Sequence, residues 1–464
     1  MAYREALNYL ASCTRVIELC NQLGGRVAIC PDWNGRVMTC SCDGLDGYSF
    51  GFVNVQEIGK NDNDSNSTNS HDDVARYLEL YGGEDQFTLS PDTGAFSLYH
   101  DQNSNPNTSS ASPASSASPL SVNGFSEGKF IVNTEPPDPE IRMSRSVEFC
   151  NGIGTRFNFD ISRLVRLLDL EEVEDIFGRS AAVLLGQTDT SYVAFQTDNT
   201  IVNCGSPVMR EAGLVSIKIR NMLNTGIDSV AVVPFREGRE IELGINFGAD
   251  FFDFAPHNQL RRLPQAVLIK ANNRHHCQVG ISRSRAVPFV GLVDFRNGNM
   301  TLVSFNLPEE ARLYDYLSNA FFETEVDVIE GNDSGTGVDF VSTRNNNIYQ
   351  RDSEFIRKNH EQLKQQAEYN HDQFDKFLVD DFSSLYSGEV VRAYNHVGSN
   401  TDINSTFRYC EFDIFSAACE LDNGEALSHQ QFTLHINADN QTLAIIAREV
   451  LGVNYEQIYE KTIK

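Results

Sequence analysis

Hydrophobic and polar residues alternate along the segment 409–415, YCEFDIF. In an extended strand, successive side chains point to opposite faces, so Tyr409, Glu411 and Asp413 share one face. The residues between them are apolar and share the other face. The pattern therefore predicts a strand with an apolar face packed into a core and a polar face that looks outward. A sheet presents a polar ligand site in this way.

Shorter alternating runs, separated by Gly and Asn, recur elsewhere in the chain. They occupy residues 25–42, 87–99, 181–195, 229–235 and 301–307. Strands at this spacing without intervening helices indicate antiparallel sheets stacked as a sandwich. We expect a mainly β protein that forms a single large domain over residues 1–464.

Two segments have a helical pattern instead. Residues 1–20 predict an amphipathic helix and not a signal peptide, because four charged residues interrupt the stretch. Its candidate core positions are Leu7, Leu10, Val16, Ile17 and Leu19. Residues 351–378 predict a helical insertion lying on the sandwich, as a cover, a lid or an oligomer contact. Its apolar stripe comprises Phe355, Leu363, Ala367, Phe374 and Leu378.

Two further segments contain almost no apolar side chains, residues 60–73 and residues 101–123. Segments of this composition cannot bury enough apolar surface to join a core. We expect both to be flexible surface loops.

Charge and cysteine content narrow the function classes. The 464 residues carry a formal charge of −27, which disfavours a nucleic-acid partner because phosphates would be repelled. No apolar run reaches the roughly 18 residues that a membrane helix needs. The ten cysteines are scattered, and the lone pair Cys40 and Cys42 lacks the second ligand pair of a zinc site. We expect reduced thiols, a cytoplasmic location, and no metal or cofactor.

Five motifs, in order along the chain, resemble an uncharacterised bacterial family with a galactose mutarotase-like fold. They are YGGEDQFTLSPDTGAFSLY (81–99), NTIVNCG (199–205), CQVGISRSRA (277–286), GEVVRAYN (388–395) and the strand at 409–415 with the segment after it. The resemblance implies a supersandwich of antiparallel sheets that binds a saccharide. The chain departs from the family at Gln86 and Thr88, where Arg and Trp would be expected. Its one tryptophan is Trp33, so tyrosine and phenylalanine would supply any stacking contact to a sugar.

The resemblance also implies a general base. Mutarotation needs a base at the C1 hydroxyl and an acid at the ring oxygen. The glutamate that serves as the base in mutarotases falls here at Asp413, and Glu411 on the same face is an alternative. If the two carboxylates are close, their repulsion would raise one pKa toward neutrality. The alternative interpretation is a solvated polar face on an outer strand.

The acid is harder to place. Asn199 stands where mutarotases have a histidine, and an amide cannot donate a proton in this way. His276 and His396 are the candidate replacements, although each by itself is more typical of an ordinary surface histidine.

Other polar residues are candidates for binding substrate. Glu84 and Asp85 could hold sugar hydroxyls at the mouth of a site, or could cap a tight glycine turn. Arg274, Arg283 and Arg285 could hold a sugar acid or phosphate, or could pair with acidic side chains. The remaining candidates are Asn203, Asn395 and Tyr409.

Three hypotheses follow. The chain is an aldose or sugar-acid epimerase without a cofactor, a saccharide-binding protein without catalysis, or a scaffold module that uses the inserted helix as its contact. The expected partner is a small-molecule saccharide, and the expected state is a monomer or homodimer.

Overall fold

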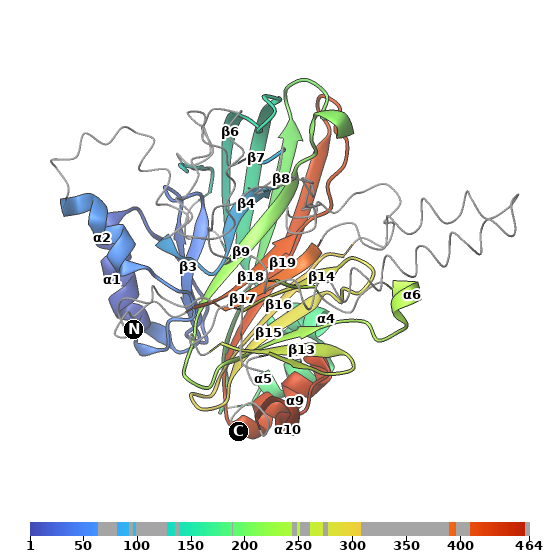
Figure 1. Cartoon of the computed structure of the whole chain (residues 1–464). Helices are drawn as coiled ribbons and strands as arrows, with labels where there is room; N and C mark the ends of the chain where they lie inside the picture. The colour runs from blue at the N-terminus through green and yellow to red at the C-terminus, as the bar shows by residue number, and fades with distance from the viewer. Residues whose placement is uncertain are drawn as a thin grey trace, which may run out of the picture.

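The computed structural model describes residues 1–63, 81–91, 96–98, 128–134, 139–187, 189–243, 248–250, 260–271, 277–307, 389–395 and 409–459 (Figure 1). The expected loop 101–123 and the expected helical insertion 351–378 lie outside these residues. The expected loop 60–73 lies mostly outside them. Its first residues belong to helix α2 (Val55–Asn63).

Within the described residues, the strands form three sheets in which every strand pair is antiparallel. The ten-stranded sheet has the order β12 (Leu260–Arg262), β13 (Ala266–Lys270), β10 (Val230–Pro234), β15 (Phe289–Asp294), β16 (Asn299–Phe305), β19 (Ala426–Asn437), β8 (Ser191–Asn203), β7 (Arg156–Leu167), β6 (Glu140–Cys150) and β5 (Ile131–Val132). The six-stranded sheet has the order β11 (Gly248–Asp250), β14 (Cys277–Ser282), β17 (Glu389–Asn395), β18 (Tyr409–Phe415), β9 (Ser216–Asn224) and β4 (Gln86–Ser90). The three-stranded sheet comprises β1 (Ile17–Cys20), β2 (Arg26–Cys30) and β3 (Arg36–Ser41). The predicted mainly β class with large antiparallel sheets is confirmed.

The ten-stranded sheet is buried on both faces at its strands β10, β15 and β16. Ala231 and Val233 pack toward the six-stranded sheet, in one core with Phe412 and Ile414 of β18. Val230, on the opposite face of the same strand, packs in a second core beneath the helices. Strands buried on both faces are nearly continuous in apolar residues, as the sequence VAVVP of β10 is.

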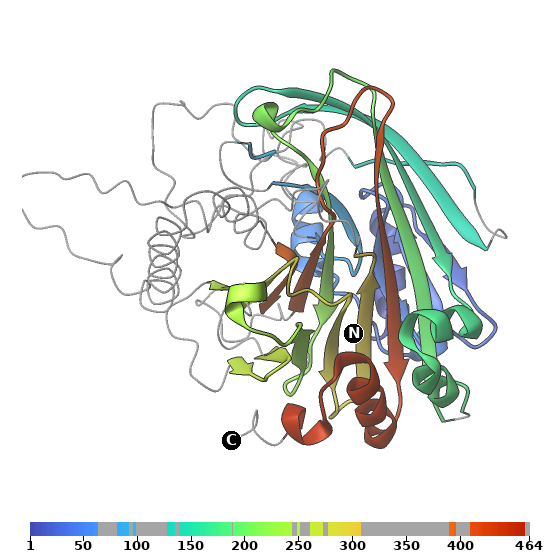
Figure 2. The same cartoon turned by 90° about the vertical axis from the view of Figure 1, so that its right-hand side faces the viewer.

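Four helices cover that second core. They are α4 (Leu170–Phe177), α5 (Arg179–Leu185), α9 (Asn440–Leu451) and α10 (Tyr455–Tyr459), grouped at one end of the ten-stranded sheet (Figure 1). In the turned view, the long strands β6 to β8 (teal to green) run along one side of the molecule, with α4 and α5 at their lower end (Figure 2). Short helical pieces complete the described chain: η1 (Gly44–Asp46), η3 (Arg210–Ala212) and α6 (Glu240–Leu243).

A third core joins the other end of the ten-stranded sheet to the three-stranded sheet. Phe159 and Phe195 of the long strands pack there with Val27 of β2 and with Phe87 of β4. This core brings β3 and β4 close to β8 and β19, which decides the surroundings of several predicted site residues.

Two predicted elements differ from the structure. The N-terminal helix α1 (Tyr3–Cys13) ends earlier than expected, and Ile17 and Leu19 lie in strand β1. Their alternation with Glu18 satisfies a strand equally well, and pairing with β2 decides between the two states. The run 181–195 begins with the end of helix α5, because Ala181 and Leu185, four residues apart, pack on one face of that helix.

Among the described residues, no helix is long and apolar enough to cross a membrane.

Candidate functional site

Strand β18 carries its carboxylates in the middle of the six-stranded sheet, between β17 and β9. Asp413 is opposite Arg392 of β17 and Arg220 of β9, and Glu411 is opposite Tyr394 of β17. Phe412 and Ile414 are fully buried in the core on the other face. The predicted strand at 409–415, with Glu411 and Asp413 on one face, is therefore confirmed.

Arginine side chains from both neighbouring strands pair with these carboxylates. The Arg220 Nε is 3.1 Å from Glu411 Oε1 and 3.3 Å from Asp413 Oδ1. The Arg392 Nη1 is 3.7 Å from Asp413 Oδ2. Lys218 lies two residues before Arg220 on β9, so it shares their face. We call Glu411, Asp413, Arg220, Lys218 and Arg392 the carboxylate face.

The carboxylate face is not the solvated surface that the alternation alone suggested. The Glu411 side chain is 13% exposed and that of Asp413 only 3% exposed. Burial and the neighbouring cations therefore control the charge of both groups.

The two carboxyl groups differ in acidity. Burial raises the pKa of Glu411 to about 7, with a smaller upward contribution from the charge of Asp413, against the opposing effect of Arg220. Burial alone would also raise the pKa of Asp413. However, Lys218, Arg220 and Arg392 hold the pKa of Asp413 below its usual value. At neutral pH, Asp413 stays ionised while Glu411 exchanges its proton. The expected repulsion by Asp413 contributes to the raised pKa of Glu411, but burial is the larger cause of that rise.

Two tyrosines border Glu411. Burial, followed by the charge of Glu411, raises the pKa of Tyr394 and the pKa of Tyr409 well above the ordinary range, so both phenols keep their protons. The Tyr409 ring stacks on Phe52 at 4.8 Å between centroids. The face thus places a group that can accept a proton beside two protonated phenols and fixed cations, which can hydrogen-bond a polar substrate.

A separate cavity of about 220 Å³ is lined by Phe52 and Asn224, among other residues. Pockets for small ligands typically occupy roughly 300–1,000 Å³. This cavity falls below that range, and none of the residues that line it belongs to the carboxylate face.

Glu84 and Asp85, the two acidic residues of the glycine turn, are buried and do not lie at the mouth of a site as expected. Asp85 is fully buried and forms an ion pair with Arg163 of β7. It also accepts hydrogen bonds from Thr197 Oγ1 at 2.9 Å and from Gln431 Nε2 at 3.0 Å. Because Thr197 and Gln431 belong to the ten-stranded sheet, Asp85 is an interior group between the layers and not the mouth of a site. Glu84 is also fully buried, near His435.

Asn199 belongs to the same group of buried polar side chains between the sheets, together with Asp85, Arg163, Thr197 and Gln431, which we call the interior layer. Arg163 donates to its side-chain oxygen, and its amide nitrogen donates to the carbonyl of His429 at 3.3 Å. This layer contacts β9 through Asn221, whose neighbours in sequence, Arg220 and Met222, point to the opposite face. Asn199 therefore lies behind the sheet that carries Glu411 and Asp413. It does not face these carboxylates as an acid would.

The other predicted binding residues have varied surroundings. Asn203 donates to the carbonyls of Ser206 and Leu421, at 2.9 Å and 3.0 Å, and holds a turn together. Arg285 is fully buried and donates to the carbonyls of Arg236 and Gly238, at 2.7 Å and 3.1 Å.

Arg283 is half-buried in the turn after β14, and Asn395 is buried at the end of β17. His276, His396 and Arg274 lie outside the described residues. Their nearest described neighbours, Cys277 and Asn395, pair with each other across β14 and β17.

Sequence reasoning missed the cations of the carboxylate face. Lys218 and Arg220 alternate with Ile217 and Ile219 in β9, a pattern as clear as that of β18. In β17, Arg392 alternates with Val391 and Ala393. These alternations give the side-chain direction, but only strand order shows that β17 and β9 flank β18.

A family profile matches residues 1–333 and 361–462, which is most of the chain. The chain belongs to DUF6786, a family of unknown function. The predicted membership of a family without an assigned activity is confirmed. No curated protein matches this DUF6786 chain in sequence.

Solved structures with similar folds share little sequence with the DUF6786 chain. The Slr1438 protein from Synechocystis sp. PCC 6803 is 9% identical, with a TM-score of 0.43 over 92% of this chain and 96% of that one. A galactose mutarotase related enzyme from Lactobacillus acidophilus is 8% identical, with a TM-score of 0.39 over 92% of this chain and 99% of that one. A TPR-domain containing protein from Parabacteroides distasonis is 8% identical, with a TM-score of 0.38 over 90% of this chain and 46% of that one.

Proposed function

We propose that the carboxylate face binds a saccharide and that Glu411 is the general base of an aldose 1-epimerase-like reaction. The observation that supports this most is the pKa of Glu411, raised to about 7 by burial beside an ionised Asp413. A base with a pKa near the working pH combines a populated acceptor form with a useful affinity for the proton. The motif resemblance to mutarotase-like proteins points to the same chemistry.

In this reaction, Glu411 takes the proton of the C1 hydroxyl while an acid protonates the ring oxygen, and the bond between C1 and the ring oxygen breaks. The open-chain aldehyde then closes again from either face, and both protons return. Asp413, held by Arg220 and Arg392, accepts hydrogen bonds from sugar hydroxyls and keeps its charge throughout. The structure thus favours Glu411 over Asp413 as the base, which reverses the preference drawn from sequence.

The proposed acid is one of the two histidines next to the paired ends of β14 and β17, His276 or His396. Imidazole is the side chain best suited to donate a proton near neutral pH, whereas the amide of Asn199, located behind the sheet, cannot act as this acid. Changing each one separately to Gln identifies the donor by its loss of rate.

The test is the rate of anomer interconversion for hexoses, pentoses and uronic acids, followed by polarimetry or NMR. Loss of a general base costs on the order of 100- to 10,000-fold, so Glu411→Gln should bring the rate close to that of buffer. The matched control is Glu148→Gln, which neutralises an exposed glutamate on β6 and should keep full activity. The wild-type rate should follow a bell-shaped pH profile: it rises as Glu411 ionises through its pKa of about 7, and it falls at higher pH as the histidine acid loses its proton.

Two results would replace this proposal. Sugar binding that depends on Asp413, without any acceleration of interconversion, supports a non-catalytic saccharide-binding protein. If none of these sugars binds or reacts, the saccharide proposal fails and the scaffold hypothesis remains.

A further inference from the structure

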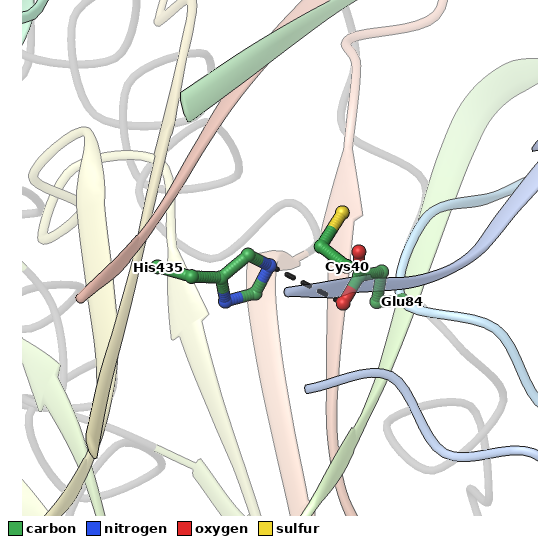
Figure 3. Close-up of side chains that lie close together, drawn as sticks. All are labelled: Cys40, Glu84 and His435. Carbon is green, nitrogen blue, oxygen red and sulfur yellow. Dashed lines mark ion pairs between the residues drawn. The ribbon is translucent and has the colours of Figure 1, made fainter. Parts of the chain in front are cut away.

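A second group of reactive side chains lies inside the molecule and plays no part in the carboxylate face. Cys40 of β3, Glu84 of the turn before β4 and His435 of β19 converge on one point (Figure 3). One ligand atom from each residue lies within 4.8 Å of the others, and all three side chains are fully buried. Three segments far apart in sequence therefore bring a thiol, a carboxylate and an imidazole together.

The polar atoms of this cluster have few other partners. Apart from contacts within the cluster, neither carboxylate oxygen of Glu84 has a hydrogen-bond partner among the described residues. The same holds for His435 Nε2, which is 3.2 Å from Glu84 Oε2. Leaving a buried polar atom without a partner is destabilising, and more so for a charged group. A bound cation would satisfy all of these atoms at once.

The imidazole of His435 is oriented with Nε2 toward Glu84 and Cys40. His435 Nδ1 is 2.9 Å from Thr301 Oγ1 of β16, and the ring stacks on Phe50 at 4.3 Å. Histidines that bind metals usually donate from the second nitrogen to a neighbouring oxygen, which orients the ring. Thr301 can accept that hydrogen bond and leave the lone pair of Nε2 directed at Glu84 and Cys40.

We propose that Cys40, Glu84 and His435 form a binding site for a borderline-soft divalent cation, zinc being the best fit. Zinc takes thiolate, imidazole and carboxylate ligands in tetrahedral geometry. If Glu84 binds through both oxygens, the three residues supply four donors. Zinc bonds of about 2.0–2.3 Å place ligand atoms roughly 3.3–3.8 Å apart, so the cluster needs only a small contraction. This inference is independent of the proposed epimerase activity.

The site would be a structural metal site that links the three sheets. Its ligands come from the three-stranded sheet, the turn leading into the six-stranded sheet, and the ten-stranded sheet. Metal binding to such a preassembled set adds to folding stability. Because the thiolate is the ligand form, Cys40 gives up its proton when the metal binds.

The first test uses the wild-type chain. It is refolded with excess zinc, separated from unbound zinc by gel filtration, and analysed for metal content by mass spectrometry. We expect about one zinc per chain. Replacement by cobalt should produce the near-ultraviolet charge-transfer band of a thiolate ligand. Wild-type protein that holds under about one tenth of an equivalent of zinc, or cobalt without that band, overturns the proposal.

Variants then assign the ligands. Cys40→Ser, Glu84→Gln and His435→Gln should each lower zinc content at least tenfold. The matched controls Cys42→Ser and His429→Gln should retain it: Cys42 is a buried thiol two residues away, and His429 is buried on the same face of β19. Equal zinc content in ligand and control variants contradicts the assignment. If a ligand variant fails to fold, the cobalt spectrum of the wild type decides the question.

Discussion

The raised pKa of Glu411 makes a prediction about stability that does not require knowing the substrate. A carboxyl group whose folded-state pKa exceeds its unfolded value binds more protons when folded. Its stabilising contribution is complete below the unfolded pKa of 4.5 and is lost as the pH rises through about 7. Glu411→Gln removes the titrating group while keeping the size of the side chain, so the variant should lack this loss.

The magnitude follows from the two pKa values. Ionising Glu411 in the folded chain, with a pKa of about 7 against 4.5 unfolded, costs about 3 kcal/mol in full, at about 1.4 kcal/mol per pH unit. Between about pH 5.5 and about pH 8.5, linkage gives a loss of about 2 kcal/mol. Over that interval, the free energy of unfolding of Glu411→Gln should rise relative to wild type by this amount.

The assay is urea denaturation of both chains at these two pH values, both above the isoelectric point of about 4.7. The unfolding free energies of the two chains are compared with the same m-value, the slope of the free energy of unfolding against urea concentration. Glu148→Gln again serves as the control and should show no pH-dependent difference. If the difference between Glu411→Gln and wild type changes by less than about 0.5 kcal/mol between the two pH values, Glu411 titrates normally. Its assignment as a base near neutrality would then be refuted.

Substitutions at three other residues test further features by the same denaturation assay. Asp413→Asn should change the free energy of unfolding in the opposite direction. The ionised Asp413 stabilises the fold above its unfolded pKa of 3.8, and this contribution is lost in acid, so the variant should be less stable than wild type at pH 7. Equal stability of the two chains at pH 7 would contradict the lowered pKa. Arg163→Ala leaves the buried carboxylate of Asp85 unpaired and should cost about 3–5 kcal/mol, and a cost under about 1 kcal/mol would show that the interior layer does not depend on this pair. Asp439→Ala removes the N-cap of α9, which accepts from the backbone of Gln441 and Thr442, and should cost about 1 kcal/mol, with Asp439→Asn retaining most of the stability.

The amino-acid sequence alone predicted the features that depend on neighbours along the chain. The alternation in YCEFDIF was enough to place Glu411 and Asp413 on one face, with Phe412 buried behind them. The same kind of pattern predicted β10 and the first helix, since side-chain direction in a strand or helix follows directly from its period. Motif order pointed to antiparallel β architecture and to a family without an assigned activity.

Tertiary structure decided everything that depends on which strands are neighbours. Arg220 reaches Asp413 across 193 residues of sequence because β9 lies beside β18, and this proximity, with burial, separates the two carboxyl pKa values. The direction in which Asn199 and Asp85 point follows from the stacking of two sheets, which local alternation cannot reveal. The convergence of Cys40, Glu84 and His435 has the same origin. Periodicity fixes the face of a strand on which a side chain lies, whereas its partners, burial and charge state depend on contacts between segments far apart in the chain.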